Sequence, residues 1–595
     1  MTTKGKPDIH VSAHPAARAT GAVTNAEVAA IFEEIADVLA IAAANPFRIR
    51  AYRNAARYIA AMPGEIAEYA RSGRDLTALP GIGEDLAEKI QEIVATGRSR
   101  TLDRLHREVP VSLTELLEIP ALGPKRVRLL HEALGIDTRD DLRRALAQGR
   151  LAGLPGLGPK TVEKIRTALA EGTVARRLRR DIAAAYARPL EAALAAVPGV
   201  VTVVTAGSFR RGRETVGDLD LLVCAADGSG VRAALARHPG VEKMLSSGST
   251  RSSLRLANGL QVDVRVVAPA SFGAALVYFT GSKAHNIALR RIAQARGLKV
   301  NEYGVFPLGG RKAIAGDTEA SVYAALGLPL IPPELREDRG ELLSAQRGEL
   351  PELVTLADLR GDLHCHTRAS DGRADLRAMA RAARVRGLDY LAITEHSARL
   401  RIAHGLDEAA LRAQMQEIER LNAAFEGLVL LKGIEVDIRD DGTLDLPDAI
   451  LNACDVVVAA VHSAFDLPSA RQTERLLRAL RNPVVDILAH PSGRLIDGRA
   501  PYAFDLARVL HAARDHGVAL ELNAQPERLD LGDAACRAAH DAGVRIALSA
   551  DAHAEQHFDY LAYGITQARR GWLEAKDVLN TRRLPALRRL LARGN

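Results

Sequence analysis

Short apolar runs in the last third of the chain end repeatedly in residues that can bind a metal ion. Amphipathic stretches of helical period, such as Leu376–Arg386 and Glu474–Arg481, separate several of these runs. Alternating strands and helices with functional residues at the carboxyl ends of the strands are typical of a (β/α) barrel. The metal-binding residues are His364, His366, Asp371, His396, Glu435, His462, His490, Asp551 and His553. This pattern predicts one metal centre at one end of a barrel.

The types of these residues indicate which metal ions the centre binds. His364 and His366 are two apart on an expected strand and therefore face the same way, and Asp371 follows in a loop. Imidazoles combined with carboxylates suit Mn²⁺, Zn²⁺ or Fe²⁺, and this many ligands fit two or three ions. A single histidine is more often an ordinary core or surface residue, but the repeated position at strand ends favours the metal centre.

A second group of carboxylates lies in the middle of the chain, in the stretch GSFRRGRETVGDLDLL at Gly207–Leu222. An expected strand begins at Asp218, so Asp218 and Asp220 point the same way. Asp263 lies on the polar face of the alternating strand GLQVDVRVV, residues 259–267. If the two strands are neighbours, three carboxylates converge on Mg²⁺ or Mn²⁺, as in-line phosphoryl transfer requires. The alternative is a set of solvated aspartates.

The residues around these aspartates suit a nucleotide. Ser208 offers a hydroxyl, Arg211 offers forked donors to phosphate oxygens, and Gly217 permits close approach of a chain. An expected helix breaks at Tyr278, Phe279 and Gly281, beside a sugar and base, and Asn286 and Arg290 share a helical face from which they can reach a base edge or the template. A buried aromatic pair and an exposed polar helix are the alternative interpretation.

A repeated motif lies in the N-terminal part of the chain. It reads LPGIGEDLAEKI from Leu79, IPALGPKRVRLL from Ile119 and LPGLGPKTVEKI from Leu154. This motif resembles the helix-hairpin-helix module, which holds DNA backbone phosphates without reading sequence. Its glycines, which let backbone N–H groups at a helix start meet a phosphate, are Gly81, Gly83, Gly123, Gly156 and Gly158. The middle copy departs from the pattern at Ala121.

Composition sets the remaining bounds. The chain of 595 residues is longer than a single domain usually is, so we expect several domains. Its net charge of +7 suits a polyanionic partner. The four cysteines have no paired spacing, which favours a reducing compartment. There is no hydrophobic leader and no apolar run of about 20 residues, so we expect a cytoplasmic protein with no membrane partner. We expect a monomer, because no coiled-coil stripe is evident.

Residues 22–335 resemble a family X DNA polymerase, the class of DNA polymerase beta. The matching features, in order, are GSFRRG…GDLD, Asp263, YFTGS, Asn286 and NEYG. The resemblance implies an α+β palm and thumb of the nucleotidyltransferase fold that acts on dNTPs and on gapped or primer-template DNA. It implies metal-binding by Asp218, Asp220 and Asp263, triphosphate-binding by Ser208, Arg211 and Gly217, a sugar site at Tyr278, Phe279 and Gly281, and a base contact from Asn286.

Other positions either extend this resemblance or depart from it. Lys89 matches the lysine that forms a Schiff base with a 5′-deoxyribose phosphate, which implies a lyase activity. Asp85 replaces a phosphate-binding lysine of the family. Gln261 and Lys283 stand where the vertebrate member has an Arg near the primer terminus and an Asp near the incoming base.

Residues 358–595 resemble the PHP (polymerase and histidinol phosphatase) domain, through the order HxH, SDG, TEH, GIEVD, VHS, AHP and DAH. All nine expected ligand positions are occupied. The resemblance implies a (β/α)7-type PHP barrel with a trinuclear phosphoesterase site. In bacterial family X polymerases such a domain resembles a 3′–5′ exonuclease and abasic-site endonuclease. The chain is therefore expected to be multidomain, with a helical helix-hairpin-helix region, a polymerase core and this barrel.

The predicted domains follow from these assignments. They are a disordered tail (1–21), a helical lyase-like DNA-binding domain (22–105), a helix-hairpin-helix fingers-like domain (106–180), a palm (181–268), a thumb-like nucleotide-selection domain (269–335), a linker (336–356) and the PHP domain (357–595). The expected function is gap filling in base-excision repair, with trimming of 3′ ends or cleavage at abasic sites. The alternatives are a PHP domain that is a phosphatase or purely structural, and a DNA-binding scaffold.

Overall fold

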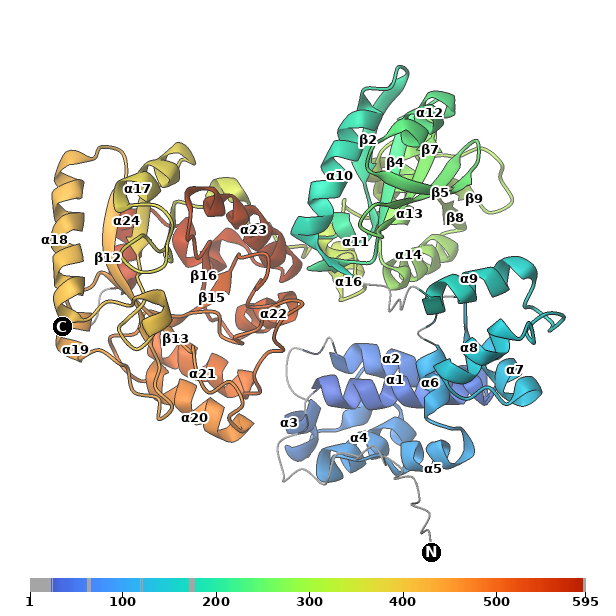
Figure 1. Cartoon of the computed structure of the whole chain (residues 1–595), viewed down its shortest axis with the longest axis horizontal. Helices are drawn as coiled ribbons and strands as arrows, with labels where there is room; N and C mark the ends of the chain where they lie inside the picture. The colour runs from blue at the N-terminus through green and yellow to red at the C-terminus, as the bar shows by residue number, and fades with distance from the viewer. Residues whose placement is uncertain are drawn as a thin grey trace, which may run out of the picture. The chain divides into compact units, whose positions relative to one another are not determined.

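The computed structural model describes residues 23–591, except 24, 61, 63–65, 118, 120 and 171–176 (Figure 1). The predicted tail, residues 1–21, lies outside the described residues. The chain forms two compact units, one made mainly of residues up to 142 and one made mainly of residues 143–467 and 473–595. Every helix in the described part of the chain is too short or too polar to traverse a lipid bilayer.

The first unit is helical, as predicted for the N-terminal region. Apolar residues at helical spacing along the first helix, among them Val28, Phe32 and Ile35, are fully buried. The ring of Phe32 meets that of Tyr52 edge to face at 5.4 Å, which joins the first two helices. The helices are α1 (Asn25–Ile41), α2 (Pro46–Ala60), α3 (Ile66–Arg71), α4 (Glu84–Thr96), α5 (Arg100–Glu108), α6 (Ser112–Leu116) and α7 (Pro124–Leu134), with α8 (Arg139–Ala147) following.

The three repeated motifs each form a tight turn followed by a helix, and the third helix is α9 (Pro159–Ala170). Gly81 and Gly156 both have φ of +77°, in the left-handed region that glycine adopts readily. Ala121, the departure in the middle copy, has φ of +71°, so the hairpin geometry is retained at the cost of some backbone strain. Gly83 and Gly123 are the N-caps of α4 and α7.

The palm is a five-stranded sheet in the order β2-β4-β7-β6-β5. Alternate apolar residues of β4 and β7, such as Leu219, Leu221 and Val262, are fully buried, which leaves the aspartates between them on the other face. Leu178 and Arg179 form strand β1, and the helix that follows begins at Arg180. The other elements are α10 (Arg180–Ala195), β2 (Val200–Thr205), α11 (Gly207–Arg210), β3 (Thr215–Val216), β4 (Asp218–Ala225), α12 (Ser229–Arg237), β5 (Val241–Ser247), β6 (Arg251–Leu256) and β7 (Gln261–Val267).

The thumb-like region and the following segment share a core. Segment 336–356, predicted as a linker, forms α16 (Glu341–Arg347) and buries Leu342, Ala345 and Leu353. Trp572, from the end of the chain, packs into the same core. The other elements of this region are α13 (Phe272–Thr280), α14 (Lys283–Ala295), β8 (Leu298–Asn301), β9 (Gly304–Pro307) and α15 (Glu319–Ala325).

The C-terminal region is a parallel seven-stranded sheet whose strands follow in chain order from β10 to β16. A bridge between Cys365 and Ala552, just beyond β10 and β16, brings the two edge strands together, so the sheet is a nearly closed barrel. The strands are β10 (Gly361–Asp362), β11 (Tyr390–Ile393), β12 (Val429–Asp437), β13 (Val456–Ala460), β14 (Ile487–Leu488), β15 (Ala519–Asn523) and β16 (Ile546–Ser549). The predicted (β/α)7 class is confirmed.

Helices connect the barrel strands, as parallel pairing requires. The connecting helices are α17 (Leu376–Val385), α18 (Glu408–Ala424), α19 (Asp448–Leu451), α20 (Ser469–Leu480), α21 (Leu506–His516) and α22 (Asp533–Asp541), and α23 (Leu561–Arg570) and α24 (Leu584–Leu591) follow the last strand. One apolar cluster fills the space between strands and helices, and another, which includes Leu363, Tyr390 and Val458, lies within the barrel. The strands are almost wholly buried, so their carboxyl ends are held in fixed positions.

Candidate active sites

The three palm aspartates lie on two neighbouring strands. Strands β4 and β7 pair in parallel, with Asp220 directly opposite Asp263 and Asp218 opposite Gln261. The pairing expected from the sequence is therefore present. Asp218 is exposed, whereas Asp220 and Asp263 are half-buried, so the group opens toward solvent from the sheet face.

These carboxylates repel one another. Burial, followed by the charges of Asp218 and Asp263, raises the pKa of Asp220 from 3.8 to about 6. Burial and the charge of Asp263 also raise the pKa of Asp218. Arg251 donates to Oδ2 of Asp263 at 3.0 Å and offsets part of this charge. Oxygen ligands held together against their repulsion fit a hard divalent cation such as Mg²⁺ or Mn²⁺.

The Gly-Ser turn lies against the aspartates. Gly207 has φ of +61°, and a Cβ there would lie 2.6 Å from Oδ2 of Asp220, so the position requires glycine. Arg211 donates from Nε to Glu337 at 3.0 Å and from Nη1 to the Thr280 carbonyl at 2.9 Å. The charge of Arg211 also lowers the pKa of Asp220, although less than burial and the other aspartates raise it.

Two other residues predicted for the triphosphate have fewer contacts. The described residues provide no hydrogen bond to the hydroxyl of Ser208, which is half-buried in α11. A Cβ at Gly217 would make only ordinary contact with Arg177, so the structure itself does not require glycine there. Their roles toward a triphosphate stay predictions.

The predicted sugar and base residues meet at the end of α13. The rings of Tyr278 and Phe279 lie 4.9 Å apart, and Gly281 ends the helix. The Asn286 amide donates to the carbonyls of Tyr278 and Gly281, at 2.7 and 3.1 Å. Asn286 therefore fixes this turn, and its predicted contact with a base stays a prediction. Arg290 is exposed on α14.

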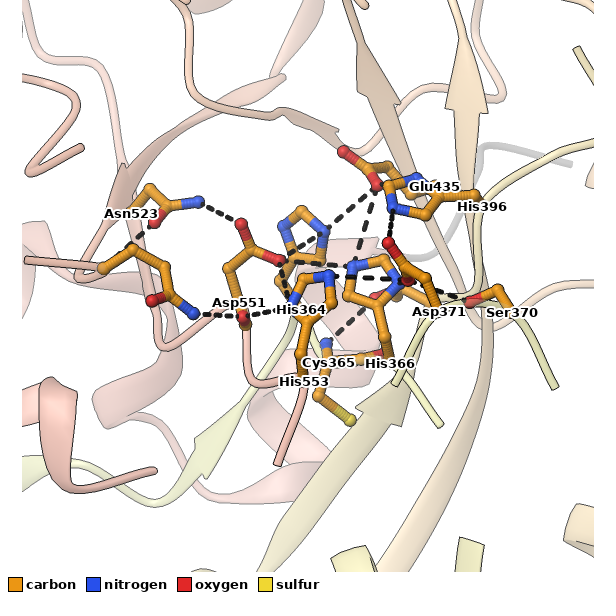
Figure 2. Close-up of polar contacts among 12 residues, drawn as sticks. His364, Cys365, His366, Ser370, Asp371, His396, Glu435, Asn523, Asp551 and His553 are labelled. Carbon is orange, nitrogen blue, oxygen red and sulfur yellow. Dashed lines mark hydrogen bonds and ion pairs between the residues drawn. The ribbon is translucent and has the colours of Figure 1, made fainter. Parts of the chain in front are cut away.

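The nine predicted barrel ligands converge at the carboxyl ends of the strands. His364 and His366 follow β10 and are not on it, which corrects the expectation that they lie on a strand. Figure 2 shows the rings of His364, His366 and His553 directed toward Asp551, with Glu435 and His396 on the other side. Three groups have donor atoms close enough to share an ion: His366, Asp371, His396 and His553; His364, His366 and Asp551; and His396, Glu435 and His462.

Glu435 is the centre of this cluster. Its Oε2 lies 2.6 Å from Nδ1 of His396, and its Oε1 lies 3.0 Å from Nε2 of His490 and 3.3 Å from Nε2 of His462. Asp551 lies 3.2 Å from Nε2 of His366 through Oδ1. Each carboxylate thus contacts more than one histidine, which is the arrangement expected of ligands shared between ions.

The chemistry of the cluster fits metal ions. Both ring nitrogens of His366 and Nδ1 of His490 are buried, and no described residue gives them a hydrogen bond of acceptable geometry. Burial and the neighbouring His553 and His396 lower the pKa of His366 to about 3, so this ring is neutral, as a ligand must be. Burial raises the pKa of Glu435, but the nearby histidines outweigh it and hold that pKa well below 4.5.

Sequence reasoning missed the residues that orient these ligands. Oε1 of Glu521 lies 2.7 Å from Nδ1 of His364, and Oε2 of Glu521 accepts from the backbone N–H of His490 at 2.7 Å. Asp437 lies 3.2 Å from Nδ1 of His462. Glu521 lies on β15, and the apolar run VALELN around it was the available signal for this strand, the sixth of the barrel.

Lys89 in the first hairpin is held by an acidic neighbour. Its ammonium forms an ion pair with the Asp85 carboxylate and donates to the Asp85 carbonyl at 3.1 Å. The side chain of Lys89 is 12% exposed. The residue that departs from the family pattern is thus the direct partner of the predicted lyase residue.

Models of known protein families match successive segments of the chain, in the same order as the predicted domains. The helix-hairpin-helix domain matches residues 23–99, the SAM-like helix-hairpin-helix tandem 113–171, the DNA polymerase beta palm 177–264, the DNA polymerase beta thumb 275–337 and the PHP domain 362–525.

Individual relatives cover the chain to different extents. The Bacillus subtilis protein named DNA polymerase/3′–5′ exonuclease PolX is 39% identical over 572 residues, which cover 96% of this chain and 99% of that protein. A probable phosphatase of Thermoanaerobacter is 33% identical over 32% of this chain and 78% of its own length. DNA polymerase lambda of Rattus norvegicus is 26% identical over 43% of this chain and 47% of its own length. The chain belongs to the family X DNA polymerases that carry a C-terminal PHP domain.

Proposed function

We propose that the chain is a DNA-directed DNA polymerase that also removes nucleotides from 3′ ends, with the two reactions at separate sites. The observation that carries the first activity is the register of β4 and β7, which groups Asp218, Asp220 and Asp263 beside the Gly207 turn. The second activity is supported by the cluster of buried histidines and carboxylates at the barrel ends. The relative named as polymerase and exonuclease supports the combination.

In the proposed synthesis reaction, the primer 3′ oxygen bonds to the α-phosphorus of a dNTP and pyrophosphate leaves. Mg²⁺ or Mn²⁺, when bound by the three aspartates, would neutralise the triphosphate and favour loss of the 3′-hydroxyl proton. Arg211 and the Gly207–Arg210 turn hold the triphosphate oxygens through side-chain and backbone donors. Tyr278 and Phe279 pack beside the sugar.

In the proposed hydrolysis, water attacks the terminal phosphodiester and a nucleoside monophosphate leaves from the 3′ end. Two or three Mn²⁺, Zn²⁺ or Fe²⁺ ions, when bound, would activate the water and neutralise the phosphate. Glu435 and Asp551 keep the ligand set anionic, and Glu521 fixes the ring of His364. Cleavage beside an abasic site is the same bond change, and we include it in the proposal.

A phosphatase is the second candidate for the PHP domain. The observation that favours it is the 33% identity to probable phosphatases over 207 residues. A phosphatase would release inorganic phosphate from small phosphomonoesters and leave DNA ends intact. The helix-hairpin-helix segments of the same chain favour DNA as the substrate.

We place these activities in gap filling during base-excision repair, on gapped or primer-template DNA. Such a protein would work as a monomer in the cytoplasm, and its net charge of +7 supports the binding of DNA. A lyase reaction at Lys89 needs a side chain free to reach the sugar, whereas the ion pair with Asp85 holds it. We therefore propose that Asp85 slows a lyase reaction at Lys89.

One assay tests both activities. Gapped DNA with a labelled primer is incubated with Mn²⁺, with and without dNTPs, using wild type, Asp263→Ala and His366→Ala. We expect Asp263→Ala to lose extension and keep degradation, and His366→Ala to lose degradation and keep extension.

Other results would contradict the proposal at defined points. Degradation that survives His366→Ala would exclude the barrel as the nuclease and favour the phosphatase or a structural role. Phosphate release from p-nitrophenyl phosphate by wild type, without shortening of DNA, would favour the phosphatase. Absence of extension by wild type would contradict the polymerase and implicate Gln261 and Lys283.

A further inference from the structure

Helix α23 of the PHP barrel contacts the palm turn that carries the predicted triphosphate-binding residues. Both segments belong to the same compact unit. Thr566, Gln567 and Arg570 of α23 contact the turn, and Tyr563 and Thr566 also contact Arg180 at the start of α10. These four residues are spaced three, one and three positions apart and so form one helical face. The contact is therefore made by a continuous surface of the helix.

Arg570 makes the most direct contact with the turn. Its Nη1 donates to the backbone carbonyl of Arg211 at 2.7 Å and to Oε1 of Glu337 at 3.0 Å. The same Oε1 of Glu337 accepts from Nε of Arg211 at 3.0 Å. Arg570 thus holds both the backbone of Arg211 and the carboxylate that orients its guanidinium.

This arrangement is buried and charge-balanced. The side chain of Arg570 is 1% exposed, and those of Glu337 and Arg211 are 11% and 13% exposed. The second nitrogen of Arg570, Nη2, donates to Asp533 at 2.6 Å, and Asp533 also accepts from Arg339. Charge-assisted hydrogen bonds with little exposure to water keep a fixed geometry better than surface ion pairs.

One group of Arg211 is left available by these contacts. Its Nε and Nη1 are engaged by Glu337 and by the Thr280 carbonyl, whereas no described residue accepts a hydrogen bond from Nη2. The same turn lies against the metal-binding carboxylates, because a Cβ at Gly207 would lie 2.6 Å from Oδ2 of Asp220.

Gly212 provides an independent observation of the same contact. Its φ is +72°, and a Cβ at this position would overlap Cγ2 of Thr566 and touch Cδ of Arg570 at 3.5 Å. The backbone of the turn therefore rests directly on α23. Glu214, two residues later, accepts from Gln567 at 2.6 Å and pairs with Arg494 of the barrel, which extends the contact to the end of the turn.

We infer that Arg570, a residue of the PHP domain, is a positioning residue for the polymerase: it holds Arg211 in the orientation that binds the triphosphate of the incoming nucleotide. This inference rests on the proposed polymerase function. A contact that only joined two domains would need no hydrogen bond to the backbone of Arg211 and no shared carboxylate with its guanidinium. In this chain the nuclease domain therefore completes the nucleotide site.

The test compares Arg570→Gln with Arg569→Gln in the full-length protein. Arg569 is the matched control, because it lies on the same helix and pairs with Glu334 and the Val354 carbonyl but does not contact the turn. Primer extension is measured as KM for the dNTP and kcat, and 3′ degradation without dNTPs reports on the integrity of the barrel. We expect Arg570→Gln to raise KM by about tenfold, the effect of losing a charge-assisted hydrogen bond. Its kcat and degradation, and all activities of Arg569→Gln, should remain as in wild type.

A second pair of variants keeps the buried charges intact. Gly212→Ala should raise the KM for the dNTP. Adding Thr566→Ala should bring the KM most of the way back to the wild-type value, because it removes the methyl group that the new Cβ at position 212 overlaps. The left-handed φ strains alanine equally in both variants, so the difference between them isolates the contact with α23.

The outcomes separate this inference from the proposed function. Unchanged KM in Arg570→Gln, or equal losses of extension and degradation in both arginine variants, would overturn the positioning role while leaving the polymerase in place. Failure of Thr566→Ala to restore Gly212→Ala would also overturn it. Absence of extension by wild type would overturn the proposed function, and the inference with it.

Discussion

The two candidate active sites of this chain are built in opposite ways. The palm site takes its three aspartates from two adjacent strands, β4 and β7, and opens to solvent. The barrel site brings together nine predicted metal ligands from the ends of six strands and buries most of them. In the barrel the ligands contact one another directly, with Glu435 as a common partner of several histidines. In the palm the aspartates repel one another, and ion pairs from outside hold the surrounding turn.

This difference in burial indicates when each site binds its metal ions. Buried ligands that contact one another favour permanently bound ions, because without a cation their donor atoms would be buried without a partner. An open group of carboxylates, by contrast, suits ions that arrive with the nucleotide and leave with pyrophosphate. Without permanently bound ions, other contacts must hold the residues around the palm site in place. The ion pairs of Arg210 with Glu319 and of Arg211 with Glu337 do so.

The largest effect is expected from a substitution that impairs only the barrel site. Glu435→Gln removes the charge shared by several histidines, so we expect 3′ degradation to fall by about a thousandfold or more and the metal content to drop. Primer extension should persist. Rates are measured on labelled DNA, and bound metal by elemental analysis, with Glu419→Gln on the exposed face of α18 as control. Retention of both metal and degradation would contradict the assigned role of Glu435.

A second prediction addresses the support of the palm turn. Glu319 accepts from Arg210 at 2.7 Å and also pairs with the fully buried Arg336. Glu319→Gln should therefore destabilise the palm and thumb by about 3 kcal/mol, because two cations lose their partner. Urea unfolding at pH 7 checks this value, and Glu349→Gln on the surface is the control. Degradation at the barrel should survive, which sharpens the contrast between the sites.

The same glutamate predicts a pH dependence. Burial raises the pKa of Glu319, but Arg210 and Arg336 outweigh it and lower the pKa from 4.5 to about 2. Because the folded pKa lies below the unfolded one, the stabilisation of about 3 kcal/mol is present above pH 4.5 and is lost as the pH falls toward 2. The difference between wild type and Glu319→Gln should shrink over that window. A constant difference would contradict the ion pair.

A smaller effect is expected from the residues behind the barrel ligands. Glu521→Gln keeps the volume but weakens the interactions with His364 and the His490 backbone, so we expect metal affinity and degradation to fall by about 10- to 100-fold. Extension should again be unaffected. Titration with Mn²⁺ or Zn²⁺ measures affinity. If Glu521→Gln lowered degradation without changing metal affinity, Glu521 would act on substrate and not on ligand geometry.

The smallest expected effect concerns Lys89. Asp85→Asn removes the ion pair that holds the Lys89 side chain, so lyase activity should rise by about threefold, the size of a surface ion pair. Borohydride trapping of the Schiff base on 5′-deoxyribose phosphate DNA measures it. Lys89→Ala combined with Asp85→Asn is the control. Trapping that persists without Lys89 would assign the reaction to another amine.

Much of both sites could be predicted from the sequence because their ligands follow local rules. Alternation along β4 put Asp218 and Asp220 on one face, and the burial of Leu219 and Leu221 bears this out. The strand-end positions of the barrel ligands were likewise visible in runs such as VVVAAVHS. The position of Glu521 was missed, because a glutamate inside an apolar strand resembles an ordinary interruption.

The predicted metal ligands of both sites and the order of the domains follow from the sequence alone, because strand periodicity and motif spacing are local properties of the chain. Only the tertiary structure decided that Asp220 lies opposite Asp263, that Glu435 links the barrel histidines and that Arg570 holds Arg211. These contacts join residues 27 to 359 positions apart in the chain, and no local sequence pattern sets them. The physical reason is that packing of whole elements, and not the preference of any single segment, brings such residues within hydrogen-bonding distance.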